Sequence, residues 1–252
     1  MLEQLVDIVR RAGDLIRDAH DMESVAHEKS SAADLVTKYD VAVQAFLKKE
    51  LLTLVPDADF LGEEGEHVTL TKPWVFVVDP IDGTTNFVRN MLVSNIAVAL
   101  VHEGVVEYGV VYNPFSEEMF YAKRGGGAFK NGHPIHASDR DMSHAVILCG
   151  STPYDRSFND HSFSLMRQLY DLGLDFRRFG AAALDLCYIA CGRAEVFFEC
   201  RLGPWDYAAG SVILTEAGGS ITRLDGTPVD PYRGGSVWAT NGICHDTLKL
   251  LK

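Results

Sequence analysis

The chain has 252 residues, 47% of them hydrophobic and 23% charged, which is enough for a globular protein with a sizeable buried core. Its 35 acidic and 23 basic side chains give a net charge of −12, which argues against nucleic-acid or anionic-membrane binding, since either needs a basic surface. The five cysteines form no CxxC pair and the N-terminus has no signal-peptide pattern, which favours a reduced, cytoplasmic protein. No run approaches the roughly 20 apolar residues of a membrane span.

The apolar spacing in the first half of the chain predicts helices and strands together. The predicted elements are helices at 3–18 and 38–54, a polar loop at 25–33, a buried strand at 74–78 and several strands within 93–121. In the second half, strands are predicted at 146–149, 195–198 and 236–239, and helices at 160–172, 181–190, 204–217 and 243–251. We therefore expect a mixed α+β or α/β protein of layered helices and sheets, with halves at about 1–140 and 141–252 and no exposed linker.

The segment DPIDGTTNF holds the strongest chemical signal. The apolar strand before it delivers Asp79 at its carboxyl end, and Pro80 cannot continue a strand ladder, so a turn is expected there. Asp82 follows, Gly83 permits a close backbone approach, and Thr84 begins a predicted helix whose first N–H groups suit a phosphate. The segment can thus present two cation ligands and an anion cradle. The alternative is an ordinary turn in which the two aspartates are capping residues.

Other carboxylates lie where predicted elements begin or end. Glu63 and Glu64 lie between two glycines, Glu199 follows an apolar strand, and Asp206 lies in the first turn of a helix. Each has a plain alternative: an exposed acidic turn, a solvated strand-end acid, or an acid favoured by the helix dipole. Oxygen ligands alone would favour Mg²⁺ or Mn²⁺ over Zn²⁺.

Taken together, and in the order expected for that family, GEEG, DPIDGTTNF, GPWD and EAGG resemble blocks of the inositol monophosphatase family, within the group that includes fructose-1,6-bisphosphatases. The resemblance extends over nearly the whole chain. It implies a sugar-phosphatase-like fold of alternating α/β/α/β/α layers, and a single unit over residues 1–252. It also implies a homodimer, which no sequence feature indicates.

The resemblance implies a metal centre with two or three Mg²⁺ ions, or Mn²⁺ in their place. Its ligands would be Glu63, Asp79, the Ile81 carbonyl, Asp82 and Asp206. The third ion, held more weakly, would lie near Glu63.

The resemblance also implies catalytic roles around an attacking water. Thr84 and Asp40 would orient the water, and Glu64 would support Glu63. For Asp40 the alternative is a helix entry capped by Thr37. Lys29 would lie in a mobile loop that approaches the site when metal binds, and the alternative is a solvated loop lysine.

A substrate-binding set is implied in the same way. Gly83 and Thr84 would hold phosphate oxygens, and Glu199 and Asp206 would contact the alcohol. Gly180, Ala181 and Ala182 match a stretch that lines the family's pocket. Ala181 stands where relatives often carry serine or threonine, and Asn95 is a second departure that has no sequence-based account.

The expected function is Mg²⁺-dependent hydrolysis of myo-inositol monophosphate, or of a similar small polyol or sugar phosphate, by direct attack of water. The alternative substrates are fructose-1,6-bisphosphate, histidinol phosphate and 3′-phosphoadenosine nucleotides. No clear basic cluster favours a second phosphate, although Arg177 and Arg178 could supply one. An alternative of another class is a regulatory binding protein of the transcription machinery.

Overall fold

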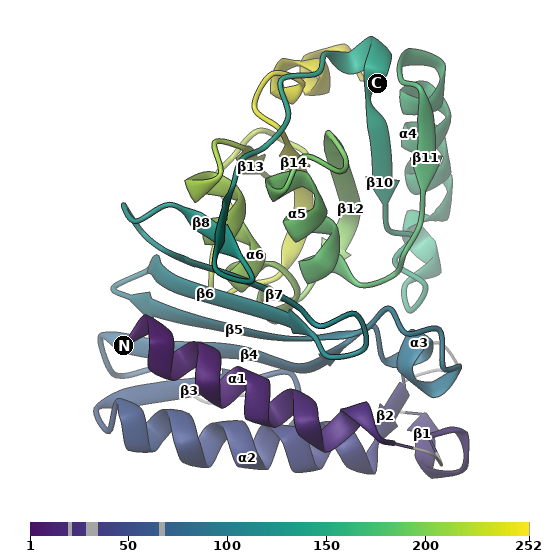
Figure 1. Ribbon diagram of the computed structural model, residues 1–252. Helices are drawn as coiled ribbons and strands as arrows, with labels where there is room; N and C mark the ends of the chain where they lie inside the picture. Colours follow the sequence, from purple (N-terminus) through teal and green to yellow (C-terminus); the bar gives the residue numbers. More distant parts are fainter. Residues whose placement is uncertain (20–21, 29–34, 66–68, 252) are drawn as a thin grey trace.

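The two large β-sheets, of seven and five strands, alternate with three helical layers in the order α/β/α/β/α, as expected (Figure 1). The computed structural model describes residues 1–19, 22–28, 35–65 and 69–251. Within these residues, no helix has both the length and the apolar character needed to cross a membrane. The division into halves near residue 140 stays a prediction.

The larger sheet has seven strands whose spatial order follows the chain, and only β3 and β4 pair in parallel. Its strands are β3 (Ala58–Gly62), β4 (Trp74–Asp82), β5 (Asn95–His102), β6 (Val105–Asn113), β7 (Glu118–Lys123), β8 (Ala128–Lys130) and β9 (His133–Ile135). Helices α1 (Leu2–Arg17) and α2 (Lys38–Leu54) cover one face of it (Figure 1). The apolar side chains that α1 presents at helical spacing, such as Leu5, Val9 and Ile16, are buried in that interface.

Helices α5 (Ala182–Ala190) and α6 (Pro204–Glu216) form the middle layer between the two sheets (Figure 1). Small residues let them lie close to their neighbours. A Cβ atom on Gly109 of β6 would come within 2.4 Å of the Ala209 carbonyl oxygen of α6. The close packing brings the N-terminal ends of both helices toward the end of β4 that carries the aspartates.

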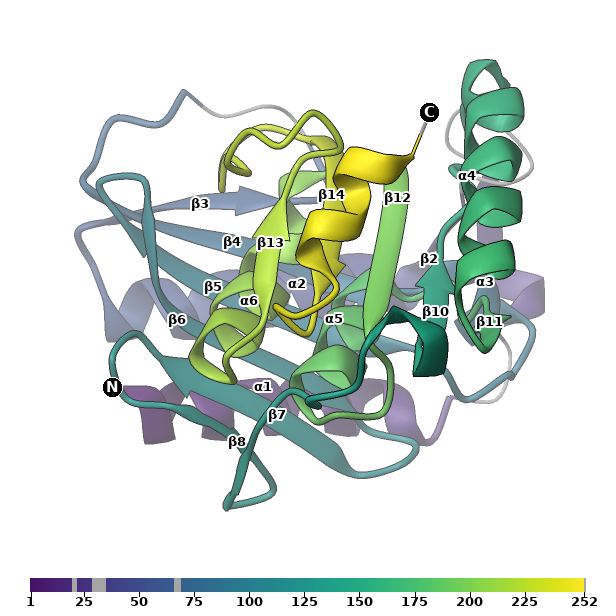
Figure 2. The same cartoon turned by 90° about the horizontal axis from the view of Figure 1, so that it is seen from above.

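The smaller sheet has five strands in the order β11-β10-β12-β14-β13. They are β10 (Val146–Cys149), β11 (Asp175–Arg177), β12 (Val196–Leu202), β13 (Ser220–Thr222) and β14 (Gly235–Thr240). Helix α4 (Asn159–Leu172) and the 3₁₀ helix η4 (His245–Leu250) form the outermost layer, and Figure 2 shows η4 lying over β12 and β14. Leu165, Trp238 and Leu248 belong to the apolar cluster under this layer.

The short elements comprise α3 (Thr84–Val88), the paired strands β1 (Ala26–Glu28) and β2 (Leu35–Thr37), and the 3₁₀ helices η1 (Glu23–Val25), η2 (Met142–His144) and η3 (Arg156–Phe158).

Four sequence-based expectations were wrong in detail. A strand, β1, occupies part of the expected loop at 25–33, because it pairs with β2. The expected helix at 243–251 is 3₁₀ rather than α and begins at His245. The two strands before the carboxylates also run further than predicted. β4 continues through Pro80 with a register shift between Asp79 and Asp82, and β12 continues past Glu199 with another.

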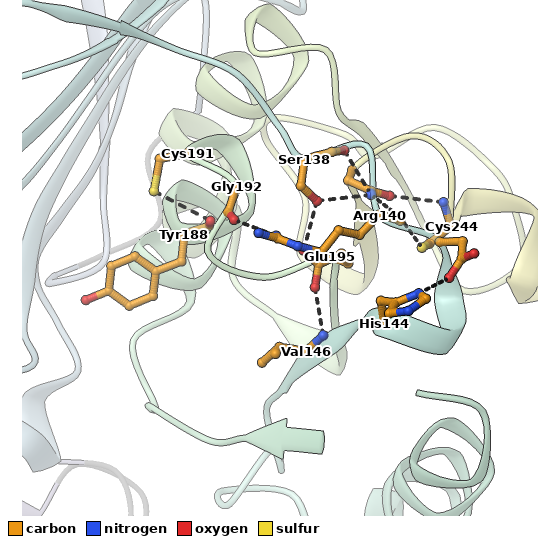
Figure 3. Close-up of polar contacts among 11 residues, drawn as sticks. Ser138, Arg140, His144, Val146, Tyr188, Cys191, Gly192, Glu195 and Cys244 are labelled. Carbon is orange, nitrogen blue, oxygen red and sulfur yellow. Dashed lines mark hydrogen bonds and ion pairs between the residues drawn. The ribbon is translucent and has the colours of Figure 1, made fainter. Parts of the chain in front are cut away.

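The buried carboxylate of Glu195 holds the segment that enters β10 in place through hydrogen bonds (Figure 3). Glu195 is only 1% exposed, and it accepts hydrogen bonds from the Ser138 hydroxyl, the Arg140 guanidinium and the backbone N–H of Val146 at 2.7–2.8 Å. Asn241 donates to the carbonyl oxygens of Ser138 and Arg140 from the other side. This network sets the position of β10, whose far end leads into the candidate site.

Candidate functional site

A polar cavity of about 260 Å³ lies where the end of β4 meets the N-terminal ends of α5 and α6. Most of the residues singled out in the sequence line it. They are Glu63, Asp79, Ile81, Asp82, Gly83, Thr84, Gly180, Ala181, Ala182, Glu199 and Asp206. The cavity therefore brings together parts of the chain that are up to 171 residues apart, from Leu35 to Asp206.

Three aspartates converge at the base of the cavity. Asp79, Asp82 and Asp206 each offer a carboxylate oxygen, and these oxygens all lie within 4.8 Å of one another. Asp79 is 1% exposed and Asp82 is 7% exposed, so little solvent screens their charges. Such a set of desolvated carboxylates is unfavourable when all are ionised, and a divalent cation among them removes the repulsion. The residues present therefore fit a hard metal ion.

Protonation is the alternative way to relieve this repulsion, and the pKa values reflect it. Burial, the charge of Glu63 and the charge of Asp82 raise the pKa of Asp79 well above its usual range. Burial and the charges of Asp82 and Glu63 do the same to the pKa of Asp206. Burial also raises the pKa of Asp82, but only to about 6, because Asn95 and the N–H groups of Ala183 and Ala182 donate hydrogen bonds that favour its carboxylate.

The shift in β4 register sets the positions of these two aspartates. Oδ1 of Asp79 accepts a hydrogen bond from the Ile81 N–H at 3.0 Å, which folds the side chain back along its own strand. The carboxylate of Asp82 accepts hydrogen bonds from the backbone N–H groups of Ala182 and Ala183, at 3.2 and 2.8 Å, in the first turn of α5. Pro80 does not end the strand, because the bulge takes up the residue that cannot donate to the ladder.

Gly83 connects β4 to α3 at a point where no larger residue fits. Its φ is 84°, in the left-handed region, and a Cβ atom would lie 3.0 Å from the Val93 carbonyl oxygen and 3.1 Å from that of Gly180. Asn86 donates to the carbonyls of Val93 and Phe179 at 2.8 and 2.7 Å, which ties α3 to the segment before α5. Within α3, the Thr84 hydroxyl donates to the Ile81 carbonyl at 3.1 Å.

Asp206 and Glu63 line the cavity together with Asp79 and Asp82. Asp206 lies in the first turn of α6 and its Oδ2 accepts the Gly203 N–H at 2.7 Å, so the helix start orients it. Glu63 follows β3, and after burial its charge is the largest cause of the raised pKa of Asp79. Glu63 lines the cavity, although it lies outside the tight group of three aspartates.

Glu199 also lines the cavity, at the point where β12 leaves regular register with β14. Its Oε1 accepts the Thr152 N–H at 2.8 Å. A Cβ atom on Gly150 would lie 1.8 Å from its Oε2, so only glycine leaves room for this carboxyl. Burial raises the pKa of Glu199 to about 7, and the hydrogen bond from Thr152 opposes that rise.

Two predicted residues, Asp40 and Glu64, are not among the described residues that line the cavity. Asp40 is fully buried in the capping box of α2, where its Oδ2 accepts the N–H and the hydroxyl of Thr37 at 2.7 and 2.6 Å. Its Oδ1 has no hydrogen-bond partner in the described chain, so the predicted role beside Thr84 stays a prediction. The backbone of Glu64 is held by Gln44 of α2. Lys29 lies outside the described residues.

Sequence reasoning missed or left unassigned four residues that shape the site. Asn95 opposes Asp82 across the β4–β5 pair and donates to it at 2.7 Å. Asp185 and Tyr154 line the cavity, as does Arg178, which the sequence marked only as a cation for a second phosphate. For Asn95 the sequence offered one signal, a polar residue at the start of an otherwise apolar strand. The positions of the other three residues depend on how α5 and the loop after β10 pack, which the sequence does not indicate.

Comparisons with known proteins identify the family of this chain. A family model described as the inositol monophosphatase family matches residues 1–250. The chain is 37% identical over 222 residues to an inositol-1-monophosphatase of Synechocystis sp., covering 87% of this chain and 77% of that protein. It is also 37% identical over 195 residues to a protein named Nus factor SuhB of Salmonella typhimurium, covering 77% and 73%. The crystal structure of the extragenic suppressor protein suhB from Bartonella henselae superposes with a TM-score of 0.90 at 33% identity, covering 98% of this chain and 96% of that one.

Proposed function

Because this chain belongs to the inositol monophosphatase family and is thus a phosphoric monoester hydrolase, we propose that it hydrolyses the monophosphate of a small polyol or sugar, myo-inositol monophosphate first among them. The observation that carries this proposal is the group of Asp79, Asp82 and Asp206 at the base of a polar cavity. Phosphate ester hydrolysis is very slow without catalysis, and neutralising the charge on the phosphate is the main help that such a site can provide.

The cation we propose is Mg²⁺, with Mn²⁺ as an alternative, because every side-chain ligand in the group is a carboxylate oxygen. Asp79, Asp82 and Asp206 would hold it, with Glu63 and the Ile81 carbonyl available for the further ions that the family resemblance implies. When bound, such ions would neutralise phosphate charge and lower the pKa of a water molecule.

The chain's own groups would position the ester and the water. Gly83 and Thr84 line the cavity beside the aspartates, where backbone N–H groups at the start of α3 could hold phosphate oxygens. The Thr84 hydroxyl, now bonded to the Ile81 carbonyl, lies where it can turn toward a water molecule. Glu199 and residues 180–182 line the same cavity and would receive the alcohol.

A phosphate-release screen tests this proposal. Purified protein would be assayed with myo-inositol, sugar, histidinol and nucleotide phosphates, each with Mg²⁺ and with a chelator. We expect release from a polyol or sugar phosphate with Mg²⁺ only, and its loss in an Asp82→Asn variant that keeps its melting temperature. Near-full, Mg²⁺-dependent release by that variant would contradict the assignment of Asp82.

A bisphosphate is the second candidate substrate, and Arg178 is the observation in its favour. Its guanidinium is exposed, its side chain lines the cavity, and Nε donates to the Ser151 hydroxyl at 3.1 Å. A second phosphate could pair with this cation. Fructose-1,6-bisphosphate belongs in the screen for this reason, and an Arg178→Ala variant should lose activity on it selectively.

A regulatory role remains the candidate from another class, since one relative is named Nus factor SuhB. Binding to a transcription partner that persists in the Asp82→Asn variant, together with no hydrolysis by the unmodified protein, would favour it.

We also propose a cytoplasmic homodimer. The five cysteines are all free, which suits a reducing compartment. Strand β11 is an edge of the smaller sheet, and Phe163, Leu174 and Phe176 on α4, β11 and the turn between them are exposed, a surface that a second copy could cover. Sedimentation of the wild type and of a Phe176→Glu variant would test this interface.

A further inference from the structure

Asp185 is a buried carboxylic acid that the proposed mechanism does not use. It lies in the first turn of α5, lines the cavity, and is 1% exposed. Its Oδ1 has no hydrogen-bond partner in the described part of the chain. Buried polar atoms in folded proteins are nearly always paired, so an unpaired carboxyl oxygen at a cavity wall needs a reason.

The charged groups around Asp185 increase the free-energy cost of burying this carboxyl group without a hydrogen-bond donor. Burial, followed by the charges of Asp82 and Glu199, raises the pKa of Asp185 well above its usual range, and the charge of Arg178 opposes this rise. A favourable helix dipole explains an acid in the first turn of α5, but it does not explain an oxygen without a donor. The missing donor is therefore expected from whatever occupies the cavity.

Glu199 lines the same cavity and has one carboxyl oxygen outside its hydrogen bonds to Thr152. The hydrogen bonds that it receives from Thr152 go to Oε1, while Oε2 lies against Gly150. Carboxyl groups from α5 and β12 thus line one cavity, and within the described residues each has an oxygen for which no hydrogen bond is seen. A leaving alcohol with more than one hydroxyl group has the donors that this pair lacks.

We propose that Asp185 is a specificity-determining residue, whose Oδ1 accepts a hydrogen bond from a hydroxyl group of the leaving polyol. The inference rests on the proposed phosphatase function and adds a contact to it. A site built to bond a hydroxyl disfavours an analogue that lacks one, because the buried acceptor is then left unpaired. Asp185 would therefore lower the affinity for esters of simple alcohols. It would have little effect on the rate of the chemical step.

Two esters with the same six-membered carbon ring test this contact: myo-inositol 1-phosphate, and cyclohexyl phosphate, which has no hydroxyl groups. In an Asp185→Leu variant, we expect KM for the inositol ester to rise on the order of tenfold to a hundredfold. The kcat for the inositol ester should stay within about twofold of the wild type, whereas the kcat/KM for cyclohexyl phosphate should rise, because leucine leaves no unpaired acceptor beside the bare ring. Asp185→Asn keeps an acceptor oxygen and should restore most of the preference.

A matched control separates specificity from folding. Glu195→Gln alters another buried acid, in the network of Figure 3, and should lower the melting temperature while leaving the ratio of the two kcat/KM values unchanged. Equal losses on both esters in Asp185→Leu, or an unchanged inositol KM, would overturn the role of Asp185 alone. No phosphate release from either ester by the wild type would overturn the proposed function, and this inference with it.

Discussion

Asn95 donates a hydrogen bond of 2.7 Å from Nδ2 to Oδ2 of Asp82, from the position directly opposite it in the β4–β5 pair. Both residues are buried. The bond favours the ionised form of Asp82 and so limits the rise that burial causes in its pKa, which stands at about 6. A residue on the neighbouring strand thus keeps one proposed metal ligand ready to bind at neutral pH.

Asn95→Leu should weaken metal binding in a pH-dependent way. Without the amide donor, the pKa of Asp82 rises above about 6, so a smaller fraction is ionised near neutrality. We expect a several-fold loss of Mg²⁺ affinity at pH 6.5 and a smaller loss at pH 8, measured by calorimetric titration. Asn113→Ala, which alters a buried asparagine that caps a turn at Phe115, is the control. Equal losses at the two pH values would contradict the role given to Asn95.

Mg²⁺ should stabilise the protein more as the pH rises. Protons and the cation compete for Asp79 and Asp206, whose pKa values are raised by burial and by neighbouring carboxylates. We expect the increase in Tm on adding Mg²⁺ to be small at pH 5.5 and larger at pH 8, and to disappear in Asp79→Asn. A ligand at a hundred times its Kd adds about 2.7 kcal/mol.

The surface variant Asp57→Asn is the control for this experiment and should keep the full increase. A rise in Tm that is the same at both pH values would argue against competition between protons and Mg²⁺.

The metal-free protein should lose stability as the pH rises through neutrality. The pKa of Glu199 is raised from 4.5 to about 7 by burial, so between these values the folded state holds a proton that the unfolded state releases. The contribution to the free energy of unfolding is therefore fully present below about 4.5 and is lost as the pH rises through about 7. Urea unfolding in EDTA from pH 5 to 8 measures it. Glu199→Gln should flatten the decline, and parallel curves for both proteins would contradict this account.

Glu195→Gln should destabilise the fold without changing the chemistry. The new amide group presents N–H donors to a position where Ser138, Arg140 and Val146 all donate (Figure 3). The mismatch and the lost charge should cost about 2–3 kcal/mol of unfolding free energy, measured by urea titration. The kcat per folded molecule should be retained. An unfolding free energy equal to that of the wild type would show that this network does not hold β10 in place.

Local sequence was sufficient to predict most of the elements. The α1 and α2 helices, the β5–β7 strands and the α4–α6 helices follow apolar spacing, and their bounds agree with the prediction to within a few residues. β1 and the extensions of β4 and β12 were not predictable, because each depends on a partner strand. Pro80 illustrates this dependence: it normally stops a strand, yet pairing on both sides of a bulge carries β4 past it.

The sequence by itself determined the ligand types and their spacing in DPIDGTTNF, because a strand, a glycine turn and a helix start are local features. It also indicated the family through blocks that can be compared one by one. The tertiary structure alone decided which distant groups complete the site: Asn95 reaches Asp82 only when β5 pairs with β4, and Asp185 joins the cavity only when α5 packs end-on against it. These contacts arise from strand register and helix packing, which no local stretch of residues specifies.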